Sequence, residues 1–145
     1  MELLSEMEKE ELINIVNYRV ETSYGAINES ESHLANGFLS TAMNRIYYAG
    51  FYMVSALAAL DNFSTAKHKQ LIGYFNKEYI NSGKIDPEVG KILRTAYDRR
   101  QAADYHDFVT LTKTQIDEYR IRMTEFIKQV ELIIKEKLSE LNNSY

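Results

Sequence analysis

The stretch 39–61 constrains the fold most, because it predicts a helix that is apolar on almost every side. Its main heptad seam consists of Leu39, Met43, Ile46, Gly50, Met53, Leu57 and Leu60. A second stripe holds the small residues Ala42, Ala49 and Ala56, which allow another helix to approach closely. A helix of this kind has to be covered by other helices or by a second subunit. The sequence therefore predicts an all-α fold with 39–61 at its centre.

Other segments carry the periodicity and capping signals of further helices. Apolar side chains recur in steps of three and four over 9–35, and a shorter helix is expected from about 64 to 81. Asp86, followed by Pro87, marks the start of a fourth helix that runs through 88–106. Thr112 and Gln115 fit a capping box that begins the last helix. We expect an up-and-down bundle of four long helices plus one shorter helix.

Length, charge and composition limit the classes of protein to consider. A chain of 145 residues has the size of one domain, so we expect a single domain over 1–145. The net charge of −4 argues against a broad, non-specific coat on nucleic acid. The absence of cysteine excludes disulfides and thiolate metal sites. With an acidic N-terminus and no apolar stretch long enough for a bilayer, the sequence predicts a cytoplasmic protein without a membrane span.

The stretch 93–107 gathers the most chemically useful side chains, among them Arg99, Arg100, Asp104, Tyr105 and His106. In one interpretation an arginine neutralises a phosphate and the histidine transfers a proton near neutral pH. In the other, Arg100 pairs with Asp104 on the helix surface and the histidine is solvated. On a continuous helix Arg100 and His106 point to different faces. A joint role therefore requires that the helix end or bend before His106, or that a second subunit supply the proximity.

Two further basic positions are candidates for a site. Arg45 lies within the most apolar helix and needs a partner, for which Asp104 is the candidate. His68, between Lys67 and Lys69, either belongs to an exposed basic turn or binds phosphate. The three histidines are far apart in sequence, and no pair has metal-ligand spacing, so neither a metal site nor a cofactor is predicted.

Three segments, taken in order, resemble the HEPN domain (higher eukaryotes and prokaryotes nucleotide-binding). They are Asn-Arg-x-Tyr-Tyr-Ala from Asn44, His-Lys-Gln-Leu from His68, and Arg-x-x-Ala-Asp-Tyr from Arg100. The resemblance covers roughly 9–133 and implies a helical bundle that commonly forms a homodimer. Many members of this family are metal-independent endoribonucleases with an Arg-x(4–6)-His motif, often toxins or defence proteins encoded beside a small nucleotidyltransferase antitoxin.

The resemblance also implies roles for particular residues. Arg100 and His106, with five residues between them, satisfy the motif, and Arg99 with six between also fits. We favour Arg100, because it also begins the Arg-x-x-Ala-Asp-Tyr segment. In the implied mechanism the 2′-hydroxyl of RNA attacks the adjacent phosphate, His106 assists proton transfer and Arg100 stabilises the phosphorane. The alternative is a non-catalytic module that binds a nucleotide or a nucleotidyltransferase partner, in which Arg100, Asp104 and Tyr105 are structural or contact residues.

Overall fold

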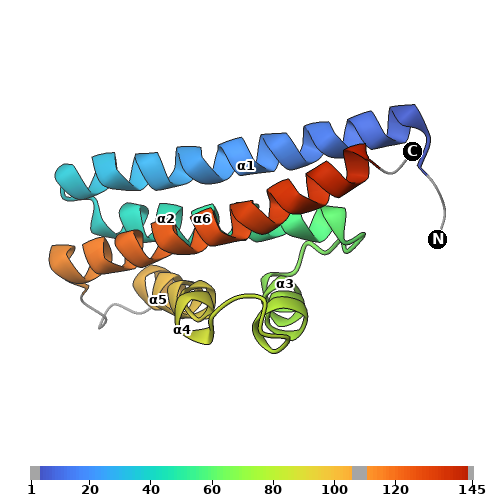
Figure 1. Cartoon of the computed structure of the whole chain (residues 1–145). Coiled ribbons are helices and arrows are strands. Elements are labelled where there is room, and N and C mark those ends of the chain that lie inside the picture. Colours follow the sequence, from blue (N-terminus) through green and yellow to red (C-terminus); the bar gives the residue numbers. More distant parts are fainter. Residues whose placement is uncertain (1–3, 106–110, 144–145) are drawn as a thin grey trace.

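Three long helices lie side by side and form the body of the molecule (Figure 1). The computed structural model describes residues 4–105 and 111–143, apart from the side chains of 102–105. The long helices are α1 (Glu6–Ala35), α2 (Leu39–Leu60) and α6 (Lys113–Asn142). Both α2 and α6 run antiparallel to α1 (Figure 1). The remaining elements are α3 (His68–Phe75), the π-helix η1 (Asn76–Ile80), α4 (Pro87–Gly90) and α5 (Ile92–Tyr105).

The predicted position of α2 at the centre of the fold is confirmed, because α2 packs against α1, α3, α5 and α6. The three alanines of its small-residue stripe are fully buried. At one of them α1 comes so close that the Ser23 hydroxyl donates to the Ala49 carbonyl at 2.6 Å. On the seam, a Cβ added to Gly50 would lie 2.7 Å from the sulfur of Met123 in α6. The two stripes of α2 thus let neighbouring helices pack at close range.

Local capping signals place the helix starts where the sequence predicts them. The Asp86 carboxylate accepts from the Glu88 backbone N–H at 2.9 Å. Thr112 and Gln115 form the complete capping box that begins α6. The first helix begins slightly before the predicted 9–35, because the Ser5 side chain caps it. The described residues contain helices and no strand, as predicted for an all-α bundle.

The third and fourth helices differ from the prediction in their extent. The third begins at His68 rather than near 64, because the Thr65 hydroxyl accepts from the Lys67 N–H at 3.1 Å and holds a turn there. The fourth is divided after Gly90 into the short α4 and the longer α5. At the division, Gly90 leaves room for Ile80, since a Cβ there would lie 2.5 Å from the Ile80 Cδ1.

No helix in the described part of the chain is both long enough and apolar enough to cross a membrane. The apolar side chains of all the long helices, together with those of α3, meet in one continuous core instead. Polar side chains that lie against this core therefore have to find partners within the fold.

Candidate functional site

One group of aromatic and basic side chains lies where α2, α3 and α5 meet. We call it the Tyr47 cluster: Tyr47, Tyr48, Phe51, His68, Tyr97 and Arg100. Tyr47 is fully buried at its centre, with ring centroids 5.6 Å from those of both His68 and Tyr97. The spacing of four residues on α2 places Phe51 on the same side, where its ring lies 4.6 Å from that of His68. His68 enters the cluster because it is the first residue of α3.

A hydrogen bond joins the two polar groups at the centre of the Tyr47 cluster. The Tyr47 hydroxyl lies 2.6 Å from His68 Nδ1. Burial, followed by the positive charge of Arg100, lowers the pKa of His68 below its ordinary value. Burial also raises the pKa of Tyr47 well above its ordinary value, although Arg100 acts in the opposite direction. Both side chains are therefore neutral at neutral pH.

Arg100 reaches the same cluster from α5. Its guanidinium carbon lies 5.3 Å from the ring centroids of both Tyr47 and Tyr48, a cation–π arrangement. The side chain is half-buried between these rings. The structure thus brings Arg100 and His68 to one tyrosine, although they are 32 positions apart in the sequence. Such a pair offers a planar cation and an imidazole to an anionic ligand.

Arg45 and Arg99 lie in different surroundings. Arg45 donates to the side chain of its neighbour Asn44 at 2.8 and 3.2 Å, and its guanidinium carbon lies 5.2 Å from the Tyr48 ring centroid. Among the side chains that the structure describes, Arg45 forms no ion pair. Arg99 is exposed and donates to the Tyr119 hydroxyl of α6 at 3.2 Å. Arg99 therefore joins α5 to α6, away from the contacts that hold Arg100.

The remaining predicted site residues fall outside what the structure describes. His106 lies in 106–110, and the side chains of Asp104 and Tyr105 are not described, although their backbone belongs to α5. The Arg100–His106 pair and the Arg45–Asp104 ion pair therefore stay predictions. In the described residues, no group of His, Cys, Asp and Glu side chains could hold a metal ion.

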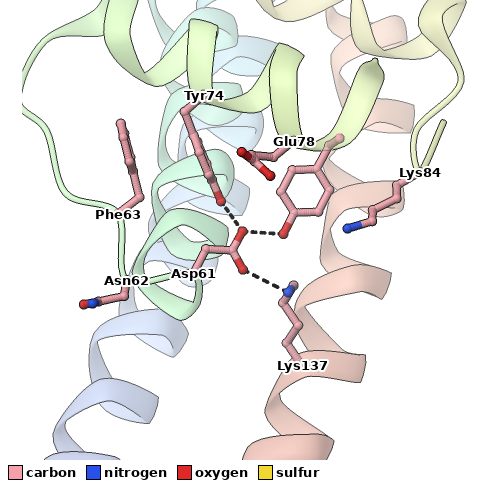
Figure 2. A pocket seen from close by; sticks show the side chains of 8 residues that line it. Asp61, Asn62, Phe63, Tyr74, Glu78, Lys84 and Lys137 are labelled. Atoms are coloured by element: carbon pink, nitrogen blue, oxygen red, sulfur yellow. Dashed lines mark hydrogen bonds and ion pairs between the residues drawn. The ribbon is translucent and has the colours of Figure 1, made fainter. Parts of the chain in front are cut away.

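A second polar group, which was not predicted from the sequence, surrounds Asp61 just after α2 (Figure 2). We call it the Asp61 cluster: Asp61, Tyr74, Tyr79 and Lys137. Both tyrosine hydroxyls donate to the same carboxylate oxygen, and Lys137 Nζ lies 2.9 Å from the other. In a regular α-helix, side chains five residues apart point in clearly different directions. The wider turn of η1 reduces that difference, so Tyr74 and Tyr79 reach one carboxylate.

The Asp61 cluster borders a surface hollow of about 400 Å³ (Figure 2). Burial by itself would raise the pKa of Asp61, but the hydrogen bonds from the two tyrosines and the charge of Lys137 together lower it below its ordinary value. The carboxylate is therefore ionised, and both of its oxygens have partners within the fold. The sequence pattern predicts only that a helix ends at Asp61, and no local signal identifies its three partners.

Comparison with known proteins identifies the family. The family model for the HEPN domain matches residues 16–141. A UPF0332 protein of Thermotoga maritima is 30% identical over 122 residues, which cover 84% of this chain and 92% of that protein. A protein of Methanocaldococcus jannaschii named as a putative toxin is 32% identical over 117 residues, covering 81% of this chain and 75% of the relative. A second protein of that organism with the same kind of name is 31% identical over 104 residues, covering 71% and 76%. With its helical bundle and a family match over most of its length, the chain belongs to the HEPN domain family.

Proposed function

We propose that this protein is a HEPN-type metal-independent endoribonuclease in which Arg100 and His106 form the active pair. The observation that carries the proposal is the position of Arg100, whose guanidinium is packed against Tyr47 and Tyr48 near the end of α5. This packing fixes a cation six positions before His106. A cation with a fixed orientation can stabilise charge that develops on a phosphate without reorganising during the reaction.

The proposed chemistry is an attack within the RNA itself. The 2′-oxygen forms a bond to the adjacent phosphorus while the bond from phosphorus to the 5′-oxygen of the next nucleotide breaks. The products are a 2′,3′-cyclic phosphate and a free 5′-hydroxyl, so no water molecule is consumed in this step. His106 assists the proton transfer between these oxygens, and Arg100 binds the charged phosphorane oxygens.

We further propose that the protein acts as a homodimer and as a toxin or defence component, paired with a small nucleotidyltransferase antitoxin. Relatives from Methanocaldococcus jannaschii that are named as putative toxins support this role. Two copies of the Arg100–His106 motif would line one cleft at the dimer interface. Arg100 of one subunit could then lie close to His106 of the other, even though the two residues point to different faces of a continuous helix. A nucleotidyltransferase reading frame beside the gene would strengthen the pairing with an antitoxin.

The test is cleavage of a single-stranded RNA with a metal chelator present. Wild-type protein should cut the RNA, and Arg100→Ala and His106→Ala should each lower the rate by roughly 10²- to 10³-fold, the usual cost of losing one group that stabilises a transition state. Arg94→Ala is the matched control. Arg94 lies on the same helix but is exposed, and its ion pair among the described residues is with Asp98, so this variant should cut at the wild-type rate.

Two other outcomes would change the proposal. Equal rates for wild type, Arg100→Ala and His106→Ala would reject the active pair. A wild-type protein that binds nucleotides but leaves RNA intact would favour the non-catalytic binding module. If Arg99→Ala abolished cleavage while Arg100→Ala did not, the motif would begin at Arg99 instead.

A further inference from the structure

The two ring nitrogens of His68 have different surroundings. Nδ1 lies 2.6 Å from the Tyr47 hydroxyl. Nε2 has no hydrogen-bond partner among the residues that the structure describes. The ring packs against Phe51 and Tyr97, at centroid distances of 4.6 and 6.1 Å, and these contacts together with the Tyr47 hydrogen bond restrict its orientation. The side chain is half-buried, and solvent therefore reaches part of it.

Tyr47 determines which ring nitrogen carries the proton. Its hydroxyl is buried, and His68 is its hydrogen-bond partner in the described part of the chain. If Nδ1 carried the hydrogen, the hydroxyl proton of Tyr47 would be left without an acceptor, at a cost of about 1–3 kcal/mol. The favoured arrangement has the hydroxyl donating to Nδ1 and the hydrogen on Nε2. His68 is then a neutral side chain whose Nε2–H has no acceptor among the described residues.

This free N–H shares its surroundings with Arg100. Tyr47 contacts both side chains, through its hydroxyl to His68 and through its ring face to the Arg100 guanidinium. The N–H donors of His68 on α3 and of Arg100 on α5 therefore lie around one buried tyrosine. Phosphate oxygens are strong acceptors, and an arginine combined with a second N–H donor suits two oxygens of one phosphate group.

We propose that His68 Nε2–H donates to a phosphate oxygen of the bound RNA and, together with Arg100, fixes the position of the phosphate. His68 is thus a binding and positioning residue, and the proton transfers belong to His106. The inference rests on the proposed function for its ligand, RNA, but it requires only binding and no cleavage.

Two substitutions of His68 separate this role from a structural one. The side-chain amide of His68→Gln lies near the position of Nε2 and can still donate to phosphate. The shorter amide of His68→Asn lies near Nδ1 and can still bond to Tyr47 but cannot reach the ligand. Affinity is measured by fluorescence anisotropy with a labelled single-stranded RNA in which all 2′-hydroxyls are methylated, so that it cannot be cut by 2′-attack.

We expect His68→Asn to bind this RNA roughly 10- to 100-fold more weakly than wild type, the cost of one hydrogen bond to a charged group. His68→Gln should stay within about threefold of wild type. His33→Asn is the matched control, because His33 contacts Phe38 near the end of α1 and lies outside the Tyr47 cluster. Thermal unfolding of each variant checks that it is folded.

The opposite order of affinities, with weak RNA binding by His68→Gln and wild-type binding by His68→Asn, would overturn the proposal. It would show that His68 serves only as the hydrogen-bond partner of Tyr47. Equal affinities for all variants, or no binding by wild type, would do the same. A long-range ¹H–¹⁵N spectrum that placed the hydrogen on Nδ1 would remove the free N–H. If wild type cleaves RNA and His68→Asn binds RNA as tightly as wild type, only the role of His68 is rejected. If RNA binding depends on His68 but wild type does not cleave RNA, only the proposed ribonuclease activity is rejected.

Discussion

The Tyr47 and Asp61 clusters both combine tyrosines with charged groups, yet they differ in how their hydrogen bonds are completed. In the Asp61 cluster one carboxylate receives two hydroxyls and an ammonium group, so both oxygens are occupied. In the Tyr47 cluster the hydrogen bond between Tyr47 and His68 leaves Nε2 without a partner in the described residues. The first cluster joins the end of α2 to η1 and α6, whereas the second offers a donor to a ligand.

This difference shows why similar residues can have different roles. A buried polar group is stabilising when every partner is present within the fold. A half-buried N–H donor that has no partner within the described fold and lies beside a cation is suited to bind an anion from solution. Substitutions should therefore affect mainly stability in the Asp61 cluster and mainly RNA binding or cleavage in the Tyr47 cluster.

Asp61→Ala should produce the largest loss of stability. The variant removes the acceptor of two tyrosine hydroxyls, and Tyr79 is almost fully buried. Leaving buried donors without an acceptor costs about 1–3 kcal/mol each, so we expect the free energy of unfolding to fall by roughly 3 kcal/mol. Chemical denaturation measures the change. Asp98→Ala, which removes an exposed helix-surface pair, should change stability by less than about 0.5 kcal/mol.

If Asp61→Ala proved as stable as Asp98→Ala, the Asp61 cluster would not hold the bundle together. The contrast between the two clusters would then be lost.

Acid should weaken the Asp61 cluster in a defined direction. The pKa of Asp61 is lower in the folded protein than its ordinary value of 3.8. The resulting stabilisation is fully present above the unfolded pKa and is lost as the pH falls through the folded pKa. The difference in unfolding free energy between wild type and Asp61→Asn should therefore shrink below about pH 4. A difference that stayed constant down to pH 2 would mean that the carboxylate charge does not matter.

Lys137→Met should have the smallest effect of the three. It removes the ion pair with Asp61 but leaves both tyrosine hydroxyls on the carboxylate. The Lys137 side chain is about a third exposed, so we expect a loss of at most about 1 kcal/mol in thermal or chemical unfolding. A loss as large as that of Asp61→Ala would mean that the ion pair, and not the pair of tyrosines, holds the carboxylate.

Much of the fold could be predicted from the sequence because its signals are local. The seam and the alanine stripe identified α2 as the central helix, and the caps at Asp86 and Thr112 act within a few residues of themselves. The division after Gly90 was missed, because it depends on Ile80 packing against that glycine from another element.

For the candidate site, the sequence by itself determined which side chains are available, among them Arg100, His68 and the tyrosines of α2. Only the tertiary structure decided that Arg100 and His68 meet at Tyr47, and that Asp61 is enclosed by Tyr74, Tyr79 and Lys137. The physical reason is one of range. Periodicity and capping depend on neighbours within one or two turns, whereas both clusters depend on how helices far apart in sequence are rotated when their apolar faces pack.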